Sequence, residues 1–175
     1  MSGTPTPVRV ERIAMGVSLL ASAIWLGGIV VLGAIVAPVV FHETPAPSNA
    51  DAMTHVFLRF DRVALVAFVL VTLAEVVRAR IAPPRMWIER ARLLAAALAG
   101  GLAIVQATWL SPTIAELHGR GAIRGFGELG TLLDVAHHRS ELCGKSEVAL
   151  LVAFVMLAGW RASSRRGGAS RGESA

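Results

Sequence analysis

The chain has 175 residues, of which 54% are hydrophobic and 17% are charged, and its mean hydropathy is +0.61. A charged share well below the ~25% that is usual for soluble domains excludes an intrinsically disordered chain and disfavours a soluble globular domain. The single cysteine excludes an intrachain disulfide framework and a four-cysteine metal site.

Four segments are candidates for membrane-spanning helices. A bilayer core about 30 Å thick requires roughly 20 mostly apolar residues in a helix. No charged residue occurs in 13–41 or in 93–110. The uncharged runs of the other two segments, 63–74 and 148–160, are shorter and must be extended toward one face of the membrane. We therefore predict an all-α polytopic membrane protein, a four-transmembrane-helix bundle with spans at about 13–38, 56–78, 91–110 and 141–161.

The distribution of Lys and Arg predicts the orientation of these spans. Basic residues concentrate in 1–12, 78–92 and 161–171, three regions that four spans place on one side of the membrane. Because basic flanks remain cytoplasmic, both termini are predicted to be inside. The net charge of +5 then reflects contact with the anionic lipid bilayer, which explains it better than nucleic-acid binding. A composition rich in Ala, Val, Gly and Leu, with far more Arg than Lys, is typical of a GC-rich bacterial genome, so we predict that the membrane is a bacterial plasma membrane.

The segments that flank and connect the spans have their own signals. Pro38 and Pro112 lie near the outer ends of the first and third spans, where proline disfavours helix continuation. After a glycine-rich loop, apolar residues from Phe126 to Ala136 recur at helical spacing and predict a short amphipathic helix on the outer surface.

The predicted membrane domain comprises residues 13–161. Residues 1–12 form a cytoplasmic N-terminus, and residues 162–175, rich in Ser, Gly and Arg, are predicted to be a disordered basic cytoplasmic tail.

Small residues indicate how the spans pack. In the third span an alanine recurs at every fourth residue from Ala91 to Ala107, next to Gly100 and Gly101. Small side chains allow helices to approach closely in lipid, where hydrophobicity gives helices no reason to associate. Packing within the bundle is the simpler explanation of this face, and a homo-oligomer interface is the alternative.

Charged and polar residues near the outer ends of the spans form one candidate site. Ionisable groups in a span are costly and usually face the bundle interior or water. If they converge, they line an outward-facing polar vestibule in which Asp61 meets Lys145 or an arginine. The alternative is that they extend into the lipid headgroups. The candidate vestibule residues are Arg59, Asp61, Arg62, Gln106, Glu141, Lys145 and Glu147.

All five histidines fall on the predicted outer side, as does the cysteine. Histidine and cysteine are ligands for copper, zinc or haem iron. His137, Ser140 and Cys143 are spaced by three and lie along one helical face, and His138 is adjacent to them. His137, His138 and Cys143 are therefore candidate ligands for copper or haem, against the alternative of ordinary hydrogen-bonding histidines. If that face points into the bundle, His137 meets Asp61 or Arg62.

Several short stretches resemble the domain-of-unknown-function 4149 family, which includes proteins similar to eukaryotic transmembrane protein 205. Trp25, Gly27, Gly28, Pro38 and Phe41 resemble its first helix. Pro112 resembles the end of its third helix, and His137, Ser140 and Cys143 resemble the start of its fourth, where Gly144 replaces a frequent asparagine. The resemblance implies a four-span membrane protein of unresolved molecular function with no catalytic residue to transfer. A weaker resemblance, to copper-resistance D-type membrane proteins, accompanies it.

Two functions follow as expectations. The first is small-solute or ion handling, or an accessory role to it, through the polar vestibule and without a cofactor. The second is metal or haem binding by the outer histidines. Because HExxH, CxxC and GxSxG motifs are absent from the sequence, no catalytic residue is assigned.

The topology is testable by thiol labelling in a Cys143→Ser background. A cysteine at Ser48 should react with an impermeant reagent in intact cells, and one at Ser170 should react only after permeabilisation. The reverse pattern would refute the orientation.

Overall fold

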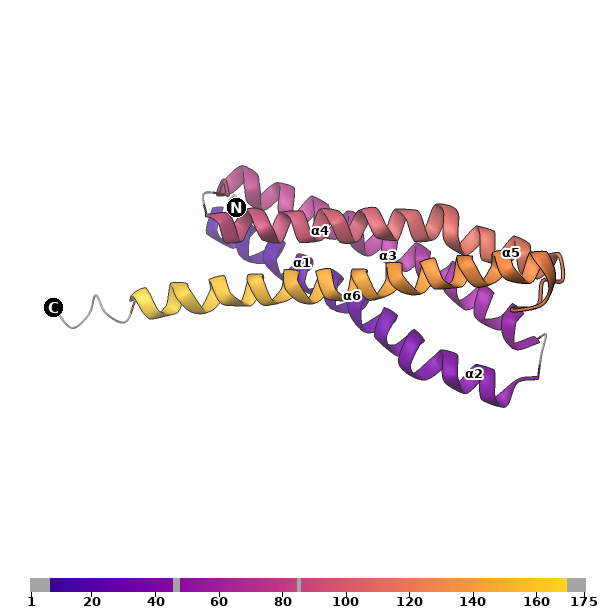
Figure 1. The fold of residues 1–175 in the computed structure, drawn as a ribbon. Helices are drawn as coiled ribbons and strands as arrows, with labels where there is room; N and C mark the ends of the chain where they lie inside the picture. The colour runs from indigo at the N-terminus through magenta and orange to yellow at the C-terminus, as the bar shows by residue number, and fades with distance from the viewer. Residues whose placement is uncertain (1–6, 46–47, 85, 170–175) are drawn as a thin grey trace, which may run out of the picture.

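The protein is described by a computed structural model that covers residues 7–45, 48–84 and 86–169, with side chains described to residue 160. The described chain is all α-helical and forms four rods, as the sequence predicts (Figure 1). The first rod is α1 (Pro7–Val31), a π-helical turn η1 (Leu32–Val36) and α2 (Ala37–Glu43); the second is α3 (Ser48–Ile81); the third is α4 (Trp87–Val105), η2 (Gln106–Leu110) and α5 (Ser111–Gly119); the fourth is α6 (Gly127–Ala169).

Successive rods run antiparallel and form a closed ring (Figure 1). α1 packs mainly on α3 and α4 mainly on α6, while α3–α4 and α1–α6 contacts close the ring. The start of α1, the α3–α4 connection and the end of α6 share one end, here called the arginine end. The α2–α3 and α5–α6 connections share the opposite end, here called the histidine end. Side chains therefore meet in the centre of the ring from all four rods.

Neither proline ends its helix. Pro38 and Pro112 each lie two residues beyond a π-helical turn, η1 and η2 respectively. Proline lacks a backbone donor and its ring crowds the carbonyl four residues earlier, and a local widening of the turn relieves both constraints. The first and third rods consequently extend to Glu43 and Gly119, beyond the ends of the predicted spans.

The predicted outer amphipathic helix is the first part of α6. Leu129, Leu133 and Ala136 pack on Ile114 and Leu117 of α5, which is the apolar face that their spacing predicts. No helix break separates this part from the predicted fourth span.

At its other end, α6 continues through residues 162–169, which were expected to be disordered. No proline interrupts the segment, so the helix that begins at Gly127 can continue, although Ser163, Ser164, Gly167 and Gly168 are weak helix formers. The rest of the predicted tail, 170–175, lies outside the described residues.

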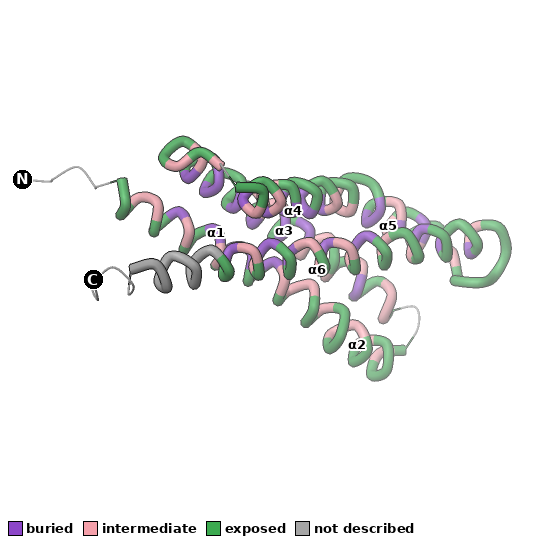
Figure 2. The backbone as a smooth tube through the Cα atoms, turned by 60° about the vertical axis from the view of Figure 1, so that its left-hand side comes forward, coloured by how far each residue is buried: buried purple, intermediate pink, exposed green. Residues whose placement is uncertain are grey.

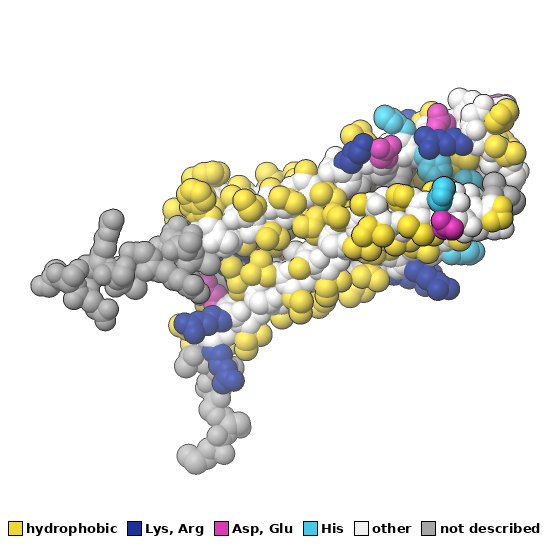
Figure 3. All heavy atoms as spheres, turned by 90° about the horizontal axis from the view of Figure 1, so that it is seen from below, with side chains coloured by type: hydrophobic (Ala, Val, Ile, Leu, Met, Phe, Trp, Pro, Cys, Tyr) yellow, Lys and Arg dark blue, Asp and Glu magenta, His cyan; other side chains and the backbone are white. Residues whose placement is uncertain are grey.

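The apolar side chains are distributed as in a membrane protein. Small residues such as Ala99 are fully buried, whereas large ones such as Leu20 and Leu94 are more than half exposed. Figure 2 shows buried and exposed positions alternating along each helix. Figure 3 shows hydrophobic side chains over the middle of the bundle and charged ones toward its two ends. Pro7–Glu43, Trp87–Gly119 and the Gly127–Trp160 part of α6 are long and apolar enough to cross a bilayer. The chain is thus a helical membrane protein.

α3 has the shortest uncharged stretch of the four rods, residues 63–74, with charged residues on both sides. Arg59, Asp61 and Arg62 precede the stretch, and Glu75 and Arg78 follow near its end. α3 is therefore not among the three described rods that are long and apolar enough to cross a bilayer, although it packs between α1 and α4. The span at 56–78 stays a prediction.

Two glycines admit phenylalanine rings of α3 against neighbouring helices. A Cβ atom on Gly28 of α1 would lie 2.2 Å from Phe60, and one on Gly100 of α4 would lie 2.0 Å from Phe68. Phe68 also meets Trp25 edge to face, with ring centroids 6.3 Å apart. These notches let α3 approach both of its neighbours, which is the role expected of small residues in lipid-embedded interfaces.

Gly100→Ala should therefore destabilise the bundle, while Gly101→Ala should not, because a Cβ on Gly101 meets nothing within 4 Å. Overpacking typically costs about 1–3 kcal/mol. Thermal unfolding in detergent should show a lower midpoint for Gly100→Ala alone. Equal midpoints would show that the Phe68 ring moves aside freely.

Candidate functional site

A column of polar side chains runs inside the bundle from the histidine end toward its middle. It draws on α1, α3, α5, α6 and the π-helical turn η2, so no single helix creates it. Its members, called the polar column below, are Trp25, Asp61, Gln106, Ser111, Ser140, Cys143 and Glu147.

The upper part of the column is organised by Gln106. Its Nε2 donates to Ser111 Oγ at 3.1 Å and to Ser140 Oγ at 2.8 Å, which links η2 to α5 and α6. The Ser111 hydroxyl in turn faces the carboxylate of Asp61 on α3. Gln106 and Ser140 are half-buried, so the column reaches the protein surface at this level.

The lower part is organised by Glu147, which is 4% exposed. Trp25 Nε1 donates to Glu147 Oε2 at 3.1 Å from the fully buried indole of α1. The Cys143 thiol lies 3.8 Å from Glu147 Oε1 and 3.4 Å from the carbonyl of Leu102. Since Ser140 and Glu147 are seven residues apart on α6, the column is about 10 Å deep.

The column carries acidic charge without a basic partner in the part of the chain that the structure describes. Asp61 is 7% exposed and lies close enough to Glu147 and Cys143 to act on both electrostatically. No described Lys or Arg forms a salt bridge with Asp61 or Glu147. Asp61 Oδ2 and Gln106 Oε1 are buried acceptors without a hydrogen-bond partner. The site therefore presents oxygen atoms to a positively charged or proton-donating guest.

The other four predicted vestibule residues lie outside the column. Arg59, Arg62, Glu141 and Lys145 are exposed on the outer faces of α3 and α6. Lys145 pairs with Glu141 on its own helix, with Nζ 2.7 Å from Oε1, and does not meet Asp61. Helical phase explains the difference, because Asp61 and Glu147 fall on the inward faces of their helices and the four others do not.

The candidate ligands do not converge on one point. The ring of His137 packs against His118, with centroids 5.6 Å apart, and His138 is exposed. Cys143 faces Glu147 instead of His137. Among the described residues, no group of three His, Cys, Asp or Glu side chains is arranged to hold a metal ion.

His118 completes the histidine end by bridging two rods. Its Nδ1 lies 3.1 Å from Thr54 Oγ1 on α3. Because Thr54 Oγ1 already donates its proton to the Ala50 carbonyl at 2.8 Å, His118 Nδ1 carries the proton of this second bond. His137 meets this histidine and not Asp61 or Arg62, because it lies nearer the end of the bundle than either.

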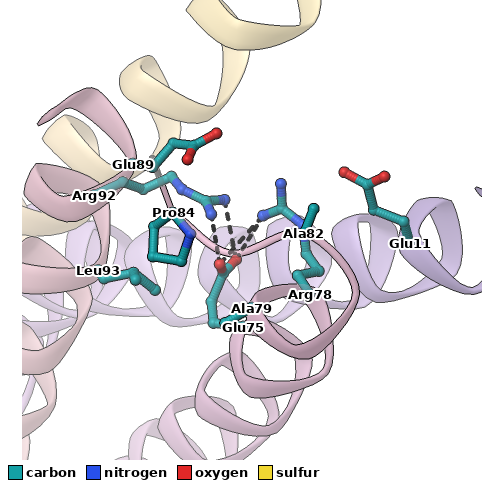
Figure 4. A pocket seen from close by; sticks show the side chains of 9 residues that line it. All are labelled: Glu11, Glu75, Arg78, Ala79, Ala82, Pro84, Glu89, Arg92 and Leu93. Carbon is teal, nitrogen blue, oxygen red and sulfur yellow. Dashed lines mark hydrogen bonds and ion pairs between the residues drawn. The ribbon is translucent and has the colours of Figure 1, made fainter. Parts of the chain in front are cut away.

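A second buried polar cluster lies at the arginine end, around the carboxylate of Glu75 (Figure 4). Arg78 Nη1 donates to Glu75 Oε1 at 2.9 Å, and Arg92 Nη2 donates to Oε2 at 2.6 Å. Ser18 Oγ adds a 2.9 Å bond from α1, and the Arg92 guanidinium lies 5.7 Å from the Phe154 ring centroid of α6. All four rods therefore meet at one ion-pair cluster.

Little space is left inside this cluster. Its cavity, lined also by Glu11 and Glu89, has a volume of about 10 Å³, which is room for one water molecule. The spacing of Glu75 and Arg78 already predicts their ion pair. The sequence does not single out Ser18 or Arg92, because Arg92 stands with Arg90 in the basic stretch 78–92 that predicts a cytoplasmic flank.

Apolar side chains separate the two clusters. Glu75 lies about 21 Å from Asp61 along α3, at 1.5 Å per residue. Between them, Phe68 and Val71 of α3 pack with Leu151 and Phe154 of α6 around the alanine face of α4. The polar column thus ends in the middle of the bundle, and the arginine cluster lies beyond this apolar layer.

Comparison with protein families identifies the family of the chain. The family described as "Domain of unknown function (DUF4149)" matches residues 20–122. The chain belongs to the DUF4149 family. The match includes most of the first rod and all of α3, α4 and α5, and therefore Trp25, Asp61, Gln106 and Ser111 of the column. It ends before α6, which supplies Ser140, Cys143 and Glu147. Searches of curated proteins and of solved structures found no match.

The residues that resemble the family have distinct places in the fold. Trp25 and Ser140 belong to the polar column, Gly28 forms a notch, and Gly27 is open to the surroundings. Pro38 and Pro112 follow the π-helical turns, Phe41 is exposed on α2, and His137 packs on His118.

The arginine cluster predicts a large effect for Glu75→Gln. The substitution removes the carboxylate that Arg78 and Arg92 share in a buried site, and breaking such a site typically costs about 3–5 kcal/mol. Glu141→Gln, which breaks an exposed pair with Lys145, is the control and should leave stability almost unchanged. Unfolding in detergent that affected both variants equally would contradict a structural role for the cluster.

Proposed function

We propose that this DUF4149 protein handles a small cation by binding it in the polar column. The proton is the cation that we propose first. The observation that carries the proposal is the burial of Asp61 and Glu147 in one site without a basic partner among the described residues. Two adjacent carboxylates in a low-dielectric interior are costly when both are ionised. A bound proton or cation removes that cost.

The geometry of the column favours a proton over a metal ion. Calcium requires six to eight oxygen ligands, and magnesium requires near-octahedral coordination. The column offers Asp61 Oδ2 and Gln106 Oε1 as open acceptors, while both oxygens of Glu147 already have neighbours. A proton needs one acceptor with a second within hydrogen-bond reach, which such a site supplies.

Access is proposed from the histidine end. Gln106 and Ser140 are half-buried, whereas Trp25 is fully buried below them. The apolar layer beneath Glu147 separates the column from the arginine end. In this conformation the column is a one-sided binding site and not a continuous pore, which supports a role in coupling or exchange.

We also propose that the arginine end faces the cytoplasm of a bacterial cell and that the histidine end faces outward. Arg9, Arg12, Arg80 and Arg90 are exposed at the arginine end, as the positive-inside rule requires. Arg78 and Arg92 are buried in the ion-pair cluster and do not contribute to this argument.

Proton binding is testable with purified protein in liposomes. Infrared difference spectra between alkaline buffer and a mildly acid buffer, in which exposed carboxylates remain ionised, should show a protonated-carboxyl band that disappears in an Asp61→Asn, Glu147→Gln double variant. Glu141→Gln is the control, because Glu141 is an exposed carboxylate of the same helix.

Uptake of protons into vesicles carrying a pH-sensitive dye provides the functional readout. The double variant should lose any uptake above protein-free vesicles, and Glu141→Gln should retain it. A carboxyl band that survives the double substitution would refute the site. If neither the wild type nor any variant takes up protons, but the wild type shows the carboxyl band, transport is refuted and proton binding in the column stands.

A further inference from the structure

The π-helical turn η2 brings two residues of the polar column together on the third rod. In a regular α-helix, residues five apart such as Gln106 and Ser111 lie about 140° apart around the helix axis. In η2 the backbone N–H of Ser111 instead donates to the carbonyl of Gln106, a five-residue hydrogen bond that closes a wider turn. The side chains meet as well, with Gln106 Nε2 3.1 Å from Ser111 Oγ. The widened turn next to Pro112 therefore pairs an amide with a hydroxyl.

The donors and acceptors at Gln106 fix the direction of two hydroxyl groups. Gln106 Nε2 carries two protons, and it donates one to Ser111 Oγ and one to Ser140 Oγ. Because each hydroxyl oxygen accepts from the amide, each hydroxyl proton points elsewhere. The Ser111 proton is donated to the carboxylate of Asp61. With the amide reversed, Ser111 would donate to Gln106 Oε1 and would turn no proton toward Asp61.

The two carboxylates of the column are thus held by different kinds of donor. Glu147 accepts from Trp25 Nε1, a ring N–H whose direction is set by the fully buried indole. Asp61 accepts from a hydroxyl, which can rotate, and its Oδ2 has no hydrogen-bond partner. Asp61 also lies in the upper part of the column, beside the half-buried Gln106. Of the two carboxylates, Asp61 is therefore the better placed to exchange a proton with the histidine end.

The surroundings of Asp61 in the described chain offer its negative charge little other support. From α6, Glu147 and the Cys143 thiol act on it electrostatically, and neither is basic. The other column side chains near it are uncharged, namely Trp25 from α1, Gln106 from η2 and Ser111 from α5. α4 carries charged residues only at the arginine end. Further titratable residues on α3, α5 and α6 are exposed (Arg59, Arg62, Glu116, Glu141 and Lys145) or lie farther toward the histidine end (His118 and His137). An ionised Asp61 therefore depends on the Ser111 hydroxyl.

From these contacts we infer that Gln106 is a positioning residue for proton exchange at Asp61. It acts through Ser111, whose hydroxyl proton it directs to the ionised carboxylate. Burial without a donor favours the protonated form of a carboxyl group so strongly that the proton is not released near neutral pH. The Ser111 bond offsets part of this effect, so Asp61 both binds and releases a proton. The inference rests on the proposed function, which is proton binding in the column.

Infrared difference spectroscopy tests the inference by the pH at which the protonated-carboxyl band of Asp61 is half formed. A Glu147→Gln background removes the other carboxylate of the column, and a further Asp61→Asn substitution identifies the band. Ser111→Ala should raise this midpoint by about one to two pH units, the range expected for the loss of a hydrogen bond to a charged group. Gln106→Met, which keeps the side-chain length and removes the amide, should raise it by about half a unit or more, because the Ser111 hydroxyl can then turn away from Asp61.

A double-mutant comparison separates positioning from general loosening of the bundle. Because Gln106 acts through Ser111, Gln106→Met should add no further shift in a Ser111→Ala background. Thr108→Val is the matched control, since the Thr108 hydroxyl lies in the same π-helical turn, is exposed and donates to the Ile104 carbonyl of its own helix. The control should leave the midpoint unchanged. Thermal unfolding verifies that each bundle is intact, and Gln106→Leu is measured beside Gln106→Met as a second variant without the amide.

The possible outcomes distinguish this inference from the proposed function. An unchanged midpoint in the Gln106 variants overturns the inference and leaves proton binding in the column in place. A shift that persists in full in the Ser111→Ala background also overturns it, because the amide then acts by another route. If no Asp61 band forms in any variant, proton binding at Asp61 is refuted, and the inference with it.

Discussion

The buried carboxylate of Glu75 is the interaction on which the bundle depends. It receives hydrogen bonds from Ser18, Arg78 and Arg92, and so joins α1, α3 and α4, while Arg92 also lies over Phe154 of α6. In a protein interior such a cluster is tolerated because each charge has a close, directional partner. Removing one partner leaves the remaining charges buried without compensation, which destabilises the folded state. The cluster therefore fixes how the four rods meet.

Close packing in the apolar layer makes these polar contacts possible. Phe68 occupies the space above Gly100, and Phe60 occupies the space above Gly28, so α3 approaches α4 and α1 without a gap. Hydrophobicity provides little drive for helix association in lipid, and small residues, aromatic contacts and hydrogen bonds replace it. Between α1 and α6, the Trp25–Glu147 hydrogen bond adds a polar contact to this packing.

The two polar clusters differ in charge balance, which separates structure from proposed function. The Glu75 cluster contains its own arginines and has a cavity of about 10 Å³. The polar column contains Asp61 and Glu147 without such a partner among the described residues. Buried polar atoms without a hydrogen-bond partner occur in both places, at Arg78 Nε in the Glu75 cluster and at Asp61 Oδ2 and Gln106 Oε1 in the column, so charge balance is what distinguishes the two. The balanced cluster joins the rods, and the unbalanced column is the site to which we assign the proposed cation binding.

The sequence by itself determined that this is an all-α membrane protein, because long uncharged runs can satisfy their backbone only as helices in lipid. It also determined the alanine face of α4 and the Glu75–Arg78 pair, since both follow from helical periodicity. Tertiary structure decided which of the predicted vestibule residues face inward. Helical periodicity shows that Asp61 and Arg62 lie on different faces of α3. Which of these faces points into the core depends on how α3 is rotated about its own axis when it packs on α1 and α4. The Glu75–Arg92 ion pair and the Trp25–Glu147 hydrogen bond likewise join residues from different helices. Helix packing brings these residues together, and no local sequence pattern predicts it.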